Sequence, residues 1–175
     1  MSPRYNSGVY LDNAKCYGAR LVKATLTWTD LRGASLSGAI LMKATGNGAV
    51  LLQAQLCRTD LRWTIFNWAY LREANLEGAC LNGADLRAAN LEQASLRGAD
   101  VSGANLNGAD LREVDLEGAS LRRTNLLGAY LAGVKLSGAD LAEALLVGAN
   151  LRRRGWEGRI SREPICMVPA WRDAI

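Results

Sequence analysis

Leucine recurs at every fifth position over most of the chain, in one unbroken register. Between Ala74 and Leu111, each unit has a small residue two positions before the leucine and usually a short polar residue between them. A step of five residues turns about 140° around an α-helix, and it places successive leucines on opposite sides of a straight strand. The pattern therefore predicts a chain that turns once per unit, with Ala and Leu inside.

The residues after each leucine are expected to form the turn. Glycine often closes the unit, and it suits turn positions that require a positive φ. The glycines with this role in the most regular stretch are Gly78, Gly83, Gly98, Gly103 and Gly108. A turn repeated at a fixed short period predicts a solenoid.

The repeated unit resembles the A-(D/N)-L-x-x motif of the pentapeptide repeat family. The resemblance implies an all-β fold, a right-handed quadrilateral parallel β-helix in which four units form one coil. The register holds from Val9 to Leu151 over 29 units, so we expect about seven coils. We divide the chain into an N-terminal extension (1–8), the pentapeptide-repeat β-helix (9–153) and a short C-terminal capping segment (154–175).

With four units per coil, residues 20 apart lie in one column along the solenoid. Gly46 replaces a core leucine, and Phe66 follows it in the same column. We predict that the phenylalanine ring fills the space that the glycine leaves.

The same arithmetic brings the tryptophans of the outer positions together and predicts a partner-binding surface. Trp28, Gly48 and Trp68 share one column, while Lys23, Lys43 and Trp63 share another. One interpretation is a slot with Gly48 as its floor, an indole on either side and Asn47 beside it, because tryptophan is enriched at binding hot spots. The other is structural: the two rings fold over Gly48 and cover the Gly46 irregularity, and Lys43 makes a cation–π contact with Trp63.

Composition argues against catalysis. The chain has no histidine, the commonest general base and metal ligand, and its glycines form no phosphate loop. We expect no enzyme activity, no cofactor, no metal site and no small-molecule substrate. The four cysteines, Cys16, Cys57, Cys80 and Cys166, have no CxxC spacing and are expected to be free thiols.

Charge decides between two hypotheses for function. From Val9 to Leu151 there are 14 basic and 14 acidic residues, and the net charge of +4 comes from the two ends. The leading hypothesis is a non-catalytic scaffold that binds another protein. The alternative, implied by the resemblance, is a DNA mimic that binds DNA gyrase or topoisomerase, but that role requires a strongly acidic surface.

The remaining expectations concern location and assembly. No apolar run is long enough to span a membrane, and no signal-peptide segment is visible, which favours a bacterial cytoplasmic protein. We do not expect nucleic-acid binding. We expect a monomer or a weak end-to-end dimer formed through the N-terminal end.

Overall fold

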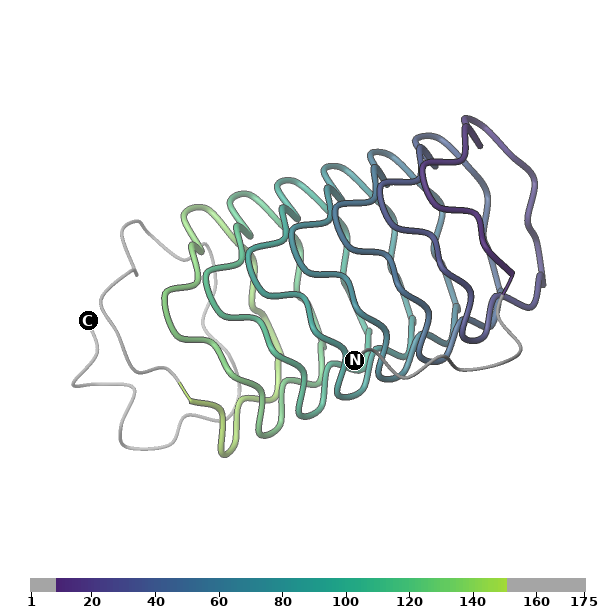
Figure 1. The fold of residues 1–175 in the computed structure, drawn as a ribbon. Helices are drawn as coiled ribbons and strands as arrows, with labels where there is room; N and C mark the ends of the chain where they lie inside the picture. Colours follow the sequence, from purple (N-terminus) through teal and green to yellow (C-terminus); the bar gives the residue numbers. More distant parts are fainter. Residues whose placement is uncertain (1–8, 151–175) are drawn as a thin grey trace.

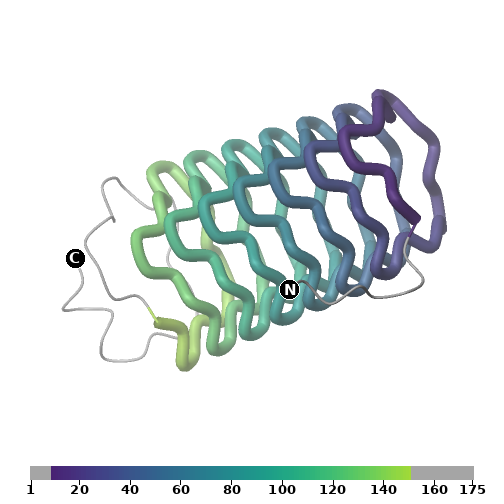
Figure 2. The backbone as a smooth tube through the Cα atoms, viewed as in Figure 1, coloured from purple at the N-terminus to yellow at the C-terminus, as the bar shows by residue number. Residues whose placement is uncertain are grey.

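The computed structural model describes residues 9–150, so the N-terminal extension and the predicted capping segment lie outside the described residues. The residue before each core position forms a parallel β-bridge with the residue 20 positions further on, from Tyr10 with Asp30 to Tyr130 with Asn150. Each circuit of the chain therefore takes four units, as predicted, and the circuits stack into a solenoid (Figure 1, Figure 2).

The β-structure consists of single-residue bridges. Residues 9–150 contain no helix and no strand longer than one bridge residue, so the short extended segments expected from the pattern are reduced to a minimum. In the same range, no helix is long and apolar enough to cross a membrane.

Every unit turns in the same way. In the first unit the carbonyl of Leu11 accepts a hydrogen bond from the N–H of Ala14 at 3.0 Å, and Asn13 has a φ of 54°. A positive φ at the second central residue defines a type II turn. The equivalent position has a positive φ in 28 units between residues 13 and 148, and 14 of these residues are glycine. The five glycines assigned to this role are confirmed, and 14 residues of other types adopt the same conformation.

Hydrogen bonds between coils support this backbone. The N–H of Leu31 donates to the carbonyl of Val50 at 2.7 Å, and the N–H of Gly33 donates to the carbonyl of Leu52 at 2.9 Å. The N–H of Asp30 points the other way, to the carbonyl of Val9 at 3.0 Å. Together with the turn bond, these contacts satisfy four of the five backbone N–H groups of a unit.

The fifth N–H explains the Asp or Asn of the motif. The N–H of Arg32, directly after the core leucine, donates to Oδ1 of Asp30 at 3.2 Å, and the N–H of Glu92 donates to Oδ1 of Asn90 at 3.0 Å. A short side chain with an oxygen acceptor makes this local bond to the backbone two residues on. In the units that carry Asp or Asn, this side chain therefore completes the turn.

The interior is a column of Ala and Leu side chains, nearly all of them fully buried from Leu26 onward. Threonine replaces alanine at a few inner positions, and its hydroxyl finds a backbone acceptor there. Oγ1 of Thr59 donates to the carbonyl of Leu36, and Oγ1 of Thr124 donates to the carbonyl of Val101, both at 3.0 Å. Among the described residues, no buried side-chain polar atom lacks a hydrogen bond.

Gly46 and Phe66 pack as predicted. A Cβ atom added to Gly46 would lie 2.1 Å from Cε1 of the Phe66 ring, so the ring occupies the space of a side chain at position 46. Phe66 is only 2% exposed. The two departures from the motif therefore compensate each other.

Phe66→Leu is expected to leave a void above Gly46 and to lower the free energy of unfolding by about 1–2 kcal/mol. Gly46→Leu alone is expected to destabilise as well, because the new side chain collides with the ring. The double variant restores two ordinary leucine positions and should recover stability. Thermal denaturation of the four proteins measures this coupling, and additive losses in the double variant would contradict the packing.

Candidate interaction surface

Side chains at the positive-φ positions lean along the solenoid, onto the same position of the next coil. A Cβ added to Gly48 would lie 2.2 Å from Cζ3 of Trp28, and one added to Gly83 would lie 2.3 Å from Cζ3 of Trp63. The six-membered ring of each tryptophan therefore covers a glycine one coil further on. Only glycine leaves room for a ring at this distance.

The open slot predicted between Trp28 and Trp68 is filled. Its floor, Gly48, lies under the Trp28 ring, so the structural interpretation is correct for this tryptophan. Phe66 fills the space at Gly46 from inside. Trp68 is followed in its column by Ala88, whose Cβ prevents so close an approach.

The other predicted residues surround these rings. Asn47 is part of the turn framework, because its Oδ1 accepts a hydrogen bond from the N–H of Asn67 at 3.1 Å. Lys23, Lys43 and Trp63 occupy one column in successive coils, since the N–H of Lys23 donates to Met42 and that of Lys43 to Arg62. The common lean directs Lys43 toward Trp63, and the cation–π contact between them stays a prediction.

One circuit of the chain carries most of the exposed apolar surface in this region. Trp63, Ile65, Trp68 and Tyr70 are 59%, 40%, 58% and 49% exposed, respectively, and we call them the aromatic surface. The sequence analysis missed Ile65 and Tyr70. Both occupy the outward position where the motif has Asp or Asn, and a large apolar residue there was the available signal.

Acidic groups of the wall are neutralised locally. In the sequence Asp-Leu-Arg, the arginine folds back on the aspartate two residues earlier: Arg112 Nη2 lies 2.6 Å from Oδ2 of Asp110. The hydrogen bond from arginine lowers the pKa of Asp30, Asp60 and Asp110 below the ordinary value. Asp115 and Asp140 have no arginine two residues later, and each pairs with one from the previous coil: Arg97 lies 3.1 Å from Asp115, and Arg122 lies 3.2 Å from Asp140.

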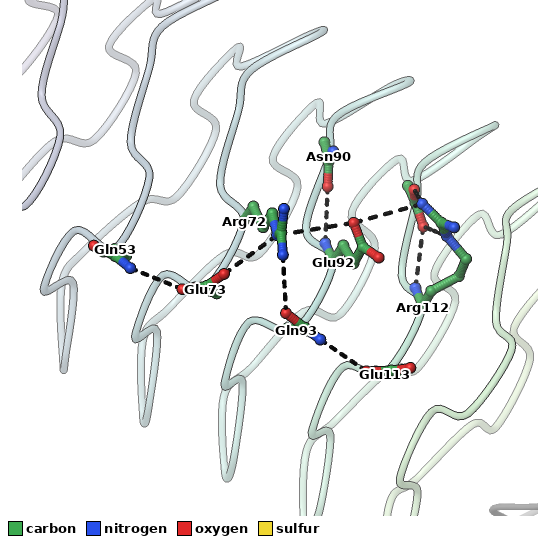
Figure 3. Close-up of polar contacts among 9 residues, drawn as sticks. Gln53, Arg72, Glu73, Asn90, Glu92, Gln93, Arg112 and Glu113 are labelled. Carbon is green, nitrogen blue, oxygen red and sulfur yellow. Dashed lines mark hydrogen bonds and ion pairs between the residues drawn. The ribbon is translucent and has the colours of Figure 1, made fainter.

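One corner of the solenoid carries a continuous polar ladder (Figure 3). Gln53 donates to Glu73 at 2.8 Å, and Gln93 donates to Glu113 at 2.9 Å, each pair one coil apart. Beside them Glu92 lies between two arginines, 3.9 Å from Arg72 and 3.5 Å from Arg112. Opposite charges one coil apart therefore pair along this corner.

A groove of about 520 Å³ begins at the N-terminal end of this corner. Its two cations, Arg32 and Arg72, are already held in ion pairs with carboxylates. Its lining residues are Asp12, Asn13, Arg32, Gly33, Leu52, Gln53, Arg72 and Glu73.

Within residues 9–150, no group of three or more potential ligand side chains is arranged to hold a metal ion. Cys16, Cys57 and Cys80 are free thiols, while Cys166 lies outside the described residues. The expectation of a chain without catalytic chemistry stays a prediction.

Comparison with known proteins agrees with this architecture. The family model for pentapeptide repeats matches in eight copies, over residues 24–62, 49–87, 69–108, 89–126 and 124–153. The chain belongs to the pentapeptide repeat family. A search of curated proteins finds no match.

Two solved structures of pentapeptide repeat proteins are similar over most of their length. HetL from the cyanobacterium Nostoc sp. strain PCC 7120, which is involved in the regulation of heterocyst differentiation, is 30% identical over 85% of each chain, with a TM-score of 0.51. QnrB1, a plasmid-mediated fluoroquinolone resistance protein, is 20% identical over 82% of this chain and 78% of its own, with a TM-score of 0.51. The second likeness shows the fold alone.

Gly48→Ala tests the contact with Trp28, and Gly108→Ala is its matched control in the same column. Both glycines have a φ near 65°, at 64° and 65°, but nothing lies within 4 Å of a Cβ at Gly108. Both variants should lose about 1 kcal/mol from the left-handed conformation. Gly48→Ala should lose more, because the Trp28 ring must move. Equal melting midpoints would show that the ring contributes nothing there.

The Asp–Arg pairs predict a pH dependence of stability. Their lowered pKa values mean that the stabilisation is present above the unfolded pKa of about 3.9 and is lost as the pH falls through the folded values. The triple variant Asp30→Asn/Asp60→Asn/Asp110→Asn keeps the turn acceptor and removes the charge. Its melting midpoint should fall less on acidification than that of the wild type, and an identical fall would contradict the assignment.

Proposed function

We propose that the protein is a non-catalytic scaffold that binds another protein through the aromatic surface. The observation that carries the proposal is the exposure of four large apolar side chains on one circuit, two of which, Ile65 and Tyr70, replace the Asp or Asn of the motif. Aromatic anchors supply much of the energy of protein interfaces.

Rigidity supports the same role. Trp63 is held by its contact with Gly83, and its backbone is fixed by hydrogen bonds in the stack. A side chain that is already ordered loses little conformational entropy on binding. A repeat scaffold with a fixed outer wall therefore presents the rings in a preorganised arrangement.

We further propose that the chain forms a right-handed square solenoid of about seven coils and that residues 154–175 form its C-terminal cap. We place the protein in the bacterial cytoplasm. Self-association would involve the N-terminal end, where Leu11, Cys16 and Leu21 of the first coil are only partly buried. The alternative of a DNA mimic that binds gyrase is disfavoured, because arginines neutralise many wall carboxylates and the wall has no net charge.

The experiment begins with capture of partners by the immobilised full chain from a lysate of its host and identification by mass spectrometry. The purified partner is then titrated against wild type, Trp68→Ala and Tyr70→Ala. Tyr130→Ala is the matched control, because Tyr130 is 50% exposed at the equivalent position three coils away.

The two test variants are expected to weaken binding by about 2 kcal/mol at an anchor position while the melting midpoint stays the same. The control should bind like wild type. Unchanged affinity in both test variants would exclude the aromatic surface as the binding site. Inhibition of gyrase supercoiling by the wild-type protein would favour the alternative.

A further inference from the structure

Free positive charge is confined to one half of the solenoid. Residues 9–68 contain seven basic and three acidic residues, whereas residues 69–150 contain seven basic and eleven acidic ones. The neutral wall is therefore a basic half followed by an acidic half.

The two halves also differ in how many of their basic residues form ion pairs. From Arg72 to residue 150, every lysine and arginine pairs with a carboxylate. In the basic half only Arg32 and Arg62 do so among the described residues. The basic residues of that half without an ion pair are Lys15, Arg20, Lys23, Lys43 and Arg58.

Two of these lysines lie next to the aromatic surface, in what we call the three-column patch. Its columns each take one residue from three successive coils. They are Lys23, Lys43 and Trp63; Thr25, Thr45 and Ile65; and Trp28, Gly48 and Trp68. None of the nine residues is acidic. An uncharged middle column thus runs between a column with two lysines and one with two indoles.

The column of Lys23 and Lys43 holds two positive charges without a paired carboxylate within residues 9–150. Lys23 and Lys43 are neighbours one coil apart, and like charges in adjacent coils repel each other. The other end of the same column is complete, because Arg123 Nε lies 2.7 Å from Oε2 of Glu143. An anion beside Lys23 and Lys43 would give these lysines an ion pair, as Glu143 does for Arg123.

We propose that the three-column patch binds an acidic segment of a partner protein, with carboxylates beside Lys23 and Lys43 and apolar side chains against Ile65 and Trp68. This inference rests on the proposed function and specifies the chemistry of the partner. The patch spans two coil steps, about 10 Å, which is the length of about three extended residues.

The boundary of the patch favours a short acidic segment over a nucleic acid. The middle column continues from Ile65 to Asp85, where the acidic half begins. A polyanion that extended along the wall would meet this carboxylate and those of the following coils. A short peptide with carboxylates at one end and apolar residues at the other would place its charge beside the lysines and would end before it reached Asp85.

The test uses the full chain and a fluorescein-labelled peptide with two adjacent glutamates followed by two leucines, with binding measured by fluorescence anisotropy. A peptide with glutamine in place of glutamate, and a short oligothymidylate, are the comparison probes. The variants are Lys23→Ser/Lys43→Ser and, as a control of equal charge, Lys15→Ser/Arg58→Ser. Lys15 and Arg58 are also free of ion pairs but lie outside the three columns.

The glutamate peptide should bind, more weakly as salt rises, and the Lys23→Ser/Lys43→Ser variant should lose about tenfold in affinity. The control variant and the melting midpoints should not change. Equal binding of the glutamine peptide, equal loss in both variants, or absence of binding would overturn the acidic specificity. Tighter, lysine-dependent binding of the oligonucleotide would also overturn it. The proposed function fails separately, when Trp68→Ala and Tyr70→Ala leave the captured partner bound.

Discussion

The structure depends on the hydrogen bonds that satisfy the backbone N–H groups of each five-residue unit. Three bond to neighbouring coils and one closes the turn, as in Leu31, Gly33, Asp30 and Ala34. The last, directly after the core residue, has no backbone acceptor in the regular pattern; where Asp or Asn precedes the core residue, its side chain accepts this hydrogen bond. Unpaired backbone groups are costly when water is excluded, so this accounting explains why the motif has a short side chain with an oxygen acceptor there.

The type II turn has a second consequence, which shapes the outer surface. It requires a positive φ once per unit and directs the side chain at that position onto the next coil. Where the next residue is glycine, a large ring fits, as Trp28 does over Gly48. Where it is polar, a hydrogen bond forms, as between Gln53 and Glu73. Side chains 20 residues apart at this position are thus in contact in pairs. A substitution at one of them changes which residue types fit at the same position of the next coil.

Column arithmetic on the sequence predicts neighbours well but not the direction in which side chains lean. It placed Phe66 on Gly46 correctly, because both positions face a narrow core in which the ring occupies the space of a side chain at position 46. It placed Trp28, Gly48 and Trp68 in one column correctly, but it left open whether Gly48 is the floor of a slot or lies under a ring. The lean of a left-handed residue toward the next coil decides that point, and it is a property of the turn geometry. Ile65 and Tyr70 do not follow from the column positions of the tryptophans, because they belong to the surface only as apolar replacements of the outward Asp or Asn.

Departures from the motif leave groups on the wall that the repeat itself does not use. A position that follows the motif is occupied by a turn bond, a core contact or a local ion pair, as Asp110 is with Arg112. The side chain of such a residue has few polar or apolar groups free to contact another molecule. Ile65 and Tyr70 replace the turn acceptor with apolar surface, and Lys23 is followed by a second lysine where Arg123 is followed by Glu143. Most polar groups of the repeat already bond to each other within the wall. The lysines without an ion pair and the exposed rings on the adjacent columns are therefore the groups that a partner protein can still contact.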